Sequence, residues 1–291
     1  MTAAERTDER TQRLRVNGLQ LLCREWGNPD APPLVLLHGL RGFSGTWRAL
    51  GTALAGQFRL IAFDQRGRGE SDWDPERNYY TDAYLSDLES VVDQLGLERF
   101  GLVGHSMGGT TSYVYAARHP ARLAALVIED IAPGSSVAGA GAERIVREMQ
   151  GMPPGFESWA EARKYWRTLR PSLSDAAIEQ RVVESLREQP DGRIGWRYDA
   201  EGIRQTRVAP DPTRIVDLWP AVERIRTPTL VIRGERSDFC PAGAVAKMCA
   251  GNPNIRAVTV AAAGHYVHDD APAEFEMHVR EFLTPLLRFV N

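Results

Sequence analysis

The run Gly104-His105-Ser106-Met107-Gly108 has the residue types and spacing to present a serine hydroxyl for nucleophilic attack. It follows the short apolar run 100–103 and precedes a helix-like run, 110–119. A serine at the tip of a sharp strand-to-helix turn has a strained backbone, so small residues are needed two positions before and after it. The two glycines meet that need. The pattern therefore predicts Ser106 as a nucleophile close to the N-terminal amides of a helix.

A nucleophilic serine needs a base and a group that orients the base. His265 follows the last apolar run, 255–260, and is the predicted base. Asp238 follows the preceding apolar run and is the predicted orienting acid, which gives the chain order Ser, Asp, His that this arrangement requires. Asp238 is also placed to cap the helix after Pro241. Asp130, which follows another strand, is the alternative acid.

Backbone amides are the predicted donors to the oxyanion. The N–H of Met107 is one, and the N–H of Leu40, just past His38-Gly39, is the other. Each such donor contributes roughly 10²- to 10³-fold in rate in sites of this kind. We expect His38 and His105 to brace these loops, and we expect His268 to be solvated.

Short apolar runs that alternate with helical patterns must position these groups. Because each run is apolar on both faces, we predict an α/β fold with a mostly parallel sheet flanked by helices. Asn17-Gly18 predicts a hairpin near the N-terminus. The runs expected as strands, besides those of the hairpin, are 33–37, 59–63, 100–103, 123–128, 228–233 and 255–260. Ligands bind such sheets at the carboxyl ends of the strands, where the candidate residues lie.

The segment 134–212 lacks strand-like runs and is rich in helical patterns, at 143–149, 158–169 and 174–187. We interpret it as a helical cap inserted between two strands of a core domain formed by 1–133 and 213–291. Aromatic residues are dense in this segment, and some of them are expected to line an apolar pocket. The residues predicted for the pocket are Arg41, Trp159, Trp166 and Tyr266.

The composition excludes several classes of protein. A net charge of −3, from 35 basic and 38 acidic residues, does not favour nucleic acid or an anionic membrane as a partner. No apolar run approaches the ~20 residues of a membrane span, and residues 1–15 do not resemble a signal peptide. The three cysteines form no disulfide framework or zinc pattern. We expect a cytoplasmic protein without metal or cofactor; the oligomeric state stays open.

Taken together, these motifs resemble the α/β-hydrolase superfamily from about Val16 to Phe289. The resemblance rests on His38-Gly39, on the loop 64–71, on 104–109, on 234–238 and on Gly264-His265. The chain looks most like capped bacterial serine esterases and lactonases. Haloalkane dehalogenases and epoxide hydrolases carry aspartate where Ser106 stands. Carbon–carbon bond hydrolases usually have tryptophan after the base, where this chain has Tyr266. Proline iminopeptidases typically have tryptophan after the serine, where this chain has Met107.

The resemblance implies a serine hydrolase that cleaves a carboxylic ester, lactone or thioester of a small hydrophobic molecule through an acyl-enzyme on Ser106. The same triad also suits carbon–carbon bond hydrolysis, lyase chemistry, or acyl transfer and cyclisation. A non-enzymatic receptor for a small ligand is the alternative of another class. Formation of a covalent acyl-enzyme separates these possibilities.

Overall fold

A computed structural model describes residues 9–135, 138–171, 173–288 and 290. Its main sheet has eight strands in the spatial order β1-β2-β4-β3-β5-β6-β9-β10. Their bounds are β1 Arg10–Val16, β2 Leu19–Trp26, β3 Pro33–Leu37, β4 Arg59–Phe63, β5 Phe100–His105, β6 Leu123–Glu129, β9 Thr229–Gly234 and β10 Ile255–Val260. The prediction of a mostly parallel sheet is confirmed, because every pair from β4 to β10 is parallel.

The two N-terminal strands form the predicted hairpin. Asn17 and Gly18 have φ angles of 49° and 85°, the left-handed values that a two-residue turn of this kind requires. β1 pairs antiparallel with β2, and β2 pairs antiparallel with β4. The hairpin therefore covers one edge of the parallel part of the sheet.

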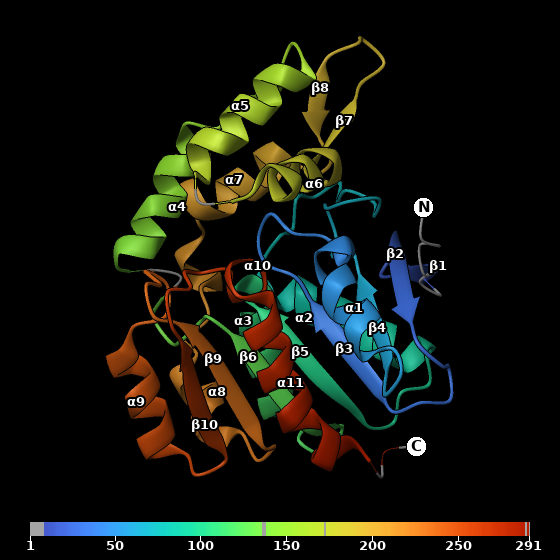
Figure 1. The fold of residues 1–291 in the computed structure, drawn as a ribbon, viewed down its shortest axis with the longest axis vertical. Helices are drawn as coiled ribbons and strands as arrows, with labels where there is room; N and C mark the ends of the chain where they lie inside the picture. Colours follow the sequence, from blue (N-terminus) through green and yellow to red (C-terminus); the bar gives the residue numbers. More distant parts are fainter. Residues whose placement is uncertain (1–8, 136–137, 172, 289, 291) are drawn as a thin grey trace.

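Helices cover both faces of the sheet (Figure 1). Those of the core are η1 Ser44–Trp47, α1 Arg48–Leu54, α2 Thr81–Gln94, α3 Met107–Arg118, α8 Trp219–Arg224, α9 Ala242–Gly251, α10 Val267–Asp270 and α11 Pro272–Leu287. Alternation along β3 shows the two faces. Leu34 and Leu36 belong to a core cluster with α1 and α11, whereas Val35 and Leu37 belong to one with α2 and α3. In the described ranges no helix has both the length and the apolar character needed to cross a membrane.

The chain between β6 and α8 forms a separate layer over the sheet (Figure 1). It contains α4 Ala140–Gln150, α5 Trp159–Leu169, α6 Asp175–Ser185, β7 Leu186–Glu188, β8 Ile194–Trp196, α7 Ala200–Val208 and η2 Pro212–Arg214. The three predicted helices are present. The expectation of a segment without strands is wrong, because β7 and β8 pair as a short hairpin. Its strands of three residues were too short to show a period of two.

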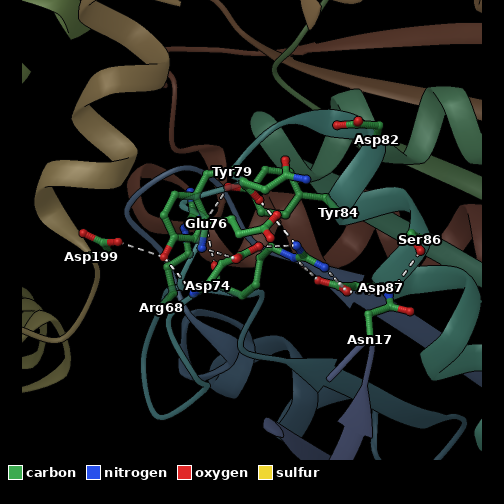
Figure 2. Close-up of polar contacts among 12 residues, drawn as sticks. Asn17, Arg68, Asp74, Glu76, Tyr79, Asp82, Tyr84, Ser86, Asp87 and Asp199 are labelled. Atoms are coloured by element: carbon green, nitrogen blue, oxygen red, sulfur yellow. Dashed lines mark hydrogen bonds and ion pairs between the residues drawn. The ribbon is translucent and has the colours of Figure 1, made fainter. Parts of the chain in front are cut away.

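A buried polar joint holds this layer, which we call the cap, to the body. The hydroxyl of Tyr79 donates to Asp199, at the start of α7, over 2.9 Å (Figure 2). The backbone N–H of Asp199 donates to the carbonyl of Gly67 over 2.9 Å. On the body side Arg66 pairs with Asp74 and Asp87. These contacts fix the position of α7 above the loop that follows β4.

Candidate active site

Ser106 lies between β5 and α3 with φ 51° and ψ −114°, a strained conformation for a residue with a side chain. The turn requires glycine two positions before and two positions after the serine, because backbone atoms approach both positions closely. A Cβ on Gly104 would lie 2.6 Å from the carbonyl oxygen of Gly108, and a Cβ on Gly108 would lie 2.4 Å from that of Leu37. The predicted strand, turn and helix around Ser106 are therefore confirmed.

His265 contacts the serine. Its Nε2 lies 3.0 Å from Ser106 Oγ, and its Nδ1 lies 2.8 Å from Asp130 Oδ2. The ring of Phe239 stacks on the imidazole with centroids 4.4 Å apart. With Nδ1–H donating to the carboxylate, Nε2 is left to accept the serine proton. Three residues that lie far apart in the sequence thus form one hydrogen-bonded chain.

The assignment of Asp238 as the orienting acid is wrong, and the alternative, Asp130, holds the position. Asp130 directly follows β6, has φ 52° and is fully buried. Its carboxylate accepts hydrogen bonds from the hydroxyl of Ser237 and, at 2.8 Å, from the N–H of Gly234. The loop after β9 therefore supplies donors to the acid rather than the acid itself.

Asp238 faces the cap instead. Both of its oxygens accept hydrogen bonds from Arg144 of α4, over 2.7 and 2.9 Å. Its side chain keeps 31% exposure, against 0% for Asp130. Because β6 and β9 are adjacent parallel strands, both aspartates lie at the same edge of the sheet. Their positions along the chain therefore do not show which of them contacts His265. In the structure Asp238 pairs with Arg144, and Asp130 contacts the imidazole.

Burial controls the protonation of the pair. It lowers the pKa of the His265 imidazole, and it raises the pKa of Asp130, which the hydrogen bonds from Ser237 and Gly234 oppose. A lowered pKa keeps His265 neutral near pH 7. The neutral imidazole is the form that can take a proton from Ser106.

A second set of polar side chains lies behind the first. Glu129 is buried and accepts hydrogen bonds from the Nδ1 and the backbone N–H of His268, at 2.8 and 2.9 Å. The expectation that His268 is solvated is wrong, since its side chain is 6% exposed. His105 Nε2 donates to the carbonyl of His265 over 3.0 Å. The expected bracing role of His105 is thereby confirmed.

The same three side chains, His105, Glu129 and His268, form the group that within the described ranges could hold a metal ion, with ligand atoms all within 4.8 Å of one another. Both oxygens of Glu129 already accept from His268, and His105 is bonded to the His265 carbonyl. These hydrogen bonds hold the segment that carries His265 in place.

The loop after β3 brings the second predicted oxyanion donor to the site. Leu40 and Met107 line the same cavity as Ser106. Met107 is the first residue of α3, so its N–H has no acceptor within the helix. His38, fully buried, accepts from the N–H of Gln65 over 3.1 Å and donates to the Gly39 carbonyl over 2.8 Å, which braces the loop as expected. The oxyanion role of the two amides stays a prediction.

The cavity at Ser106 runs between the core and the cap. Arg41 and Tyr266 line it, as predicted. Trp159 and Trp166 are not among the lining residues; Trp166 is buried in the core of the cap, against which Trp159 packs. Most of the lining is apolar and comes from both layers, and includes Ile131, Ala142, Ile145, Val146, Ile215, Val216 and Phe239. Sequence reasoning missed these residues because no pattern marks a lining that comes from several elements.

The lining also contains arginines that sequence reasoning did not single out. Arg207 of α7 and Arg214 of η2 lie on the cap side of the cavity. Arg214 is paired with Asp82, and Arg41 is paired with Glu148. Nothing in the sequence distinguishes Arg207 and Arg214 from the other arginines of the chain; only the fold brings them to the cavity.

Known proteins resemble this chain over nearly its whole length. The chain is 33% identical over 278 residues to a putative 2-succinyl-6-hydroxy-2,4-cyclohexadiene-1-carboxylate synthase of Bacillus subtilis, covering 93% of this chain and 97% of that one. It is 30% identical over 257 residues to a 3-hydroxybutyrate-oligomer hydrolase of Cupriavidus necator, covering 84% and 87%.

Among solved structures, that of E-2-(acetamidomethylene)succinate hydrolase superposes with a TM-score of 0.84 at 27% identity, covering 94% of this chain and 99% of that one. The model of the alpha/beta hydrolase fold family matches residues 32–272, from the start of β3 to the start of the last helix. The chain therefore belongs to the α/β-hydrolase fold family.

Proposed function

We propose that this protein is a serine hydrolase that cleaves a carboxylic ester, lactone or thioester, with Ser106 as nucleophile, His265 as base and Asp130 as orienting acid. The observation that carries the proposal is the hydrogen-bonded chain from Ser106 Oγ through both nitrogens of His265 to Asp130, at 3.0 and 2.8 Å. Relatives whose names describe hydrolases of oligomeric esters and of amide-bearing succinates support the general reaction class.

The proposed reaction has two steps. His265 Nε2 takes the hydroxyl proton as Ser106 Oγ attacks the carbonyl carbon, and the amides of Leu40 and Met107 donate to the oxygen that becomes negative. The imidazolium then gives its proton to the leaving alcohol, or to the thiol of a thioester, and an acyl-serine remains. A water molecule, deprotonated by His265, releases the acid and restores the serine.

The apolar part of the cavity lining supports a substrate with an apolar segment next to the scissile bond. The second candidate is a reaction that begins with proton abstraction by the same base and forms no acyl-enzyme. The Bacillus subtilis relative is named a synthase rather than a hydrolase, which supports this second candidate. The two candidates differ in whether the substrate becomes covalently attached to Ser106.

Labelling with a fluorophosphonate, followed by intact-mass measurement and peptide mapping, tests the nucleophile. We expect one adduct, on Ser106, and none in Ser106→Ala. Labelling should be at least about a hundredfold slower in His265→Ala. A panel of activated esters and lactones should then show burst release of the alcohol. Unlabelled, folded protein, or labelling at another residue, would reject the proposed nucleophile.

Trapping with an ester substrate separates the two reactions. A mass increase equal to the acyl group, seen after rapid acid quench, supports hydrolysis through Ser106. Turnover that depends on His265 without such an adduct, and with incorporation of solvent deuterium into the substrate, would favour the proton-abstraction reaction instead.

A further inference from the structure

The charged side chains around the cavity are unbalanced. Among the described lining residues are three arginines, Arg41, Arg207 and Arg214, and neither aspartate nor glutamate. Arg41 contacts Glu148 and Arg214 contacts Asp82, so each of these two has a carboxylate partner outside the lining. Arg207 has no carboxylate within ion-pair distance in the described part of the chain. One positive charge at the cavity is therefore unpaired.

The surroundings of Arg207 add positive charge rather than removing it. Arg207 interacts electrostatically with Tyr80, Tyr84 and Arg68, and burial together with the charge of Arg68 lowers the pKa of its guanidinium. Arg68 is itself fully buried and its hydrogen bonds go to neutral groups: the carbonyls of Leu40 and Arg66, the hydroxyl of Tyr84 and the sulfur of Met107.

The rings of Tyr79 and Tyr84 face the guanidinium of Arg68 at 5.6 and 5.1 Å from its carbon (Figure 2). Aromatic faces stabilise a cation only modestly, by about 0.5–2 kcal/mol. Arg207, which lines the cavity, and Arg68, which contacts Leu40 and Met107, are thus two guanidinium groups without a carboxylate partner among the described residues. An unpaired charge in a partly dehydrated site is unfavourable unless a ligand supplies the opposite charge.

We propose that the substrate carries a carboxylate as well as the scissile acyl group, and that Arg207 binds this carboxylate. The inference rests on the proposed function, since it places the scissile carbonyl at Ser106, and it specifies the class of substrate: a half-ester, or another acyl compound with a second, free carboxylate. A guanidinium suits a carboxylate because it donates two parallel hydrogen bonds to it. The apolar residues that line the same cavity then contact the chain that joins the two groups.

Matched pairs of esters test this inference. The mono-p-nitrophenyl esters of adipic and suberic acid carry a free carboxylate, and their methyl esters have the same acyl chain, with one added methyl group and no charge. We expect the wild type to show a higher kcat/KM for the charged member of at least one pair. In Arg207→Gln that preference should fall about tenfold to a hundredfold, which is the range for a lost hydrogen bond to a charged group.

The control variant is Arg204→Gln. Arg204 lies on the same helix, α7, one turn earlier; its side chain is 35% exposed and pairs with Glu201 over 2.8 Å. It should leave the preference unchanged, while Arg207→Lys should keep part of it. Equal kcat/KM for both members of every pair in the wild type, or an equal loss on both members in Arg207→Gln, would overturn the inference.

A binding measurement separates this inference from the proposed function. Calorimetry of adipate and suberate with Ser106→Ala, and with Ser106→Ala/Arg207→Gln, requires no hydrolysis. Binding that is lost with Arg207 supports the carboxylate site even if no ester is cleaved. Conversely, labelling of Ser106 and hydrolysis of the neutral esters, with no diacid binding and no charge preference, would reject the site and leave the proposed hydrolase intact.

Discussion

His265 Nδ1 lies 2.8 Å from Asp130 Oδ2, although the two residues are 135 positions apart in the chain. Asp130 is fully buried and directly follows β6, the strand next to the one that precedes the serine. Asp238, the acid predicted from the sequence, keeps 31% side-chain exposure and is bonded to Arg144 of the cap. The sheet thus offers two acids at one edge. Only one of them can orient the imidazole.

Replacing each acid in turn tests this assignment. Asp130→Asn should lower kcat by up to about 10⁴-fold, because an amide can no longer hold His265 in the tautomer that accepts the serine proton. Asp238→Asn is the matched control and should change kcat near pH 8 by less than about tenfold. Steady-state hydrolysis of a p-nitrophenyl ester and the rate of fluorophosphonate labelling both report the effect. A larger loss in Asp238→Asn than in Asp130→Asn would contradict the assignment.

The sequence was sufficient to predict the fold and two members of the proposed triad, because those signals are local. Glycines around Ser106 and the hairpin turn at Asn17-Gly18 describe backbone geometry that few other residues allow. The choice between Asp130 and Asp238 depended on which carboxylate met Ser237 and which met Arg144. Those contacts form between segments far apart in the sequence, so neither hydrophobic periodicity nor motif spacing predicts them.

The helices of the cap were predicted from the sequence, but the ion pairs that its charged residues form were not. A row of alternating charges runs from the loop after β3 through α4 to the loop after β9, formed by Arg41, Glu148, Arg144 and Asp238. Arg207, in contrast, has no such partner among the residues that the structure describes. Arginine is frequent in this chain, so a pattern of arginines gives no sign of which one faces a cavity. Their roles follow from the fold alone.

Glu148 is the central carboxylate of that row, and its removal should destabilise the protein. Burial raises the pKa of Glu148, but the neighbouring Arg41 and Arg144 outweigh it and lower the pKa. Arg41 is 5% exposed and would lose its acid partner. We expect Glu148→Gln to reduce the free energy of unfolding by about 3 kcal/mol. Urea unfolding at pH 7 measures it.

The control for Glu148 lies on the same helix. Glu143→Gln removes an exposed carboxylate 3.8 Å from Arg147, and should change stability by less than about 0.5 kcal/mol. The sign of the pH dependence is also fixed. Since the folded pKa of Glu148 is lowered, its contribution is present above about pH 4.5 and is lost as the pH falls. Equal stability of the two variants at pH 7 would refute this account of the row.

The glycine two positions after the serine should tolerate no side chain. A Cβ on Gly108 would meet backbone atoms of Leu37 at 2.4 and 2.7 Å, so either the elbow or β3 must move. We expect Gly108→Ala to lower the unfolding free energy by about 2 kcal/mol or more and to abolish labelling of Ser106. Gly243→Ala, on α9 with no atom within 4 Å of the new Cβ, should stabilise by about 0.5 kcal/mol. Thermal unfolding measures both variants: the stability should fall in Gly108→Ala and rise in Gly243→Ala. An unchanged stability of Gly108→Ala would contradict the close packing at this position.

The pH dependence of catalysis should reveal the charges around His265. Burial lowers the pKa of His265, the charge of Arg144 lowers it further, and the charge of Asp238 raises it. Activity requires the neutral imidazole, so kcat/KM should fall with acid at a midpoint below 6.5. The midpoint belongs to the coupled pair of His265 and Asp130. Unfolding curves at each pH distinguish titration from loss of structure.

Two variants should move that midpoint in opposite directions. Asp238→Asn removes a negative charge that favours the imidazolium, so the midpoint moves to lower pH. Arg144→Gln removes a positive charge that opposes the imidazolium, so the midpoint moves to higher pH. Both shifts should shrink in high salt, because Arg144 and Asp238 are each 31% exposed. Shifts in the same direction would mean that the two residues act on His265 through the position of the cap rather than through their charges.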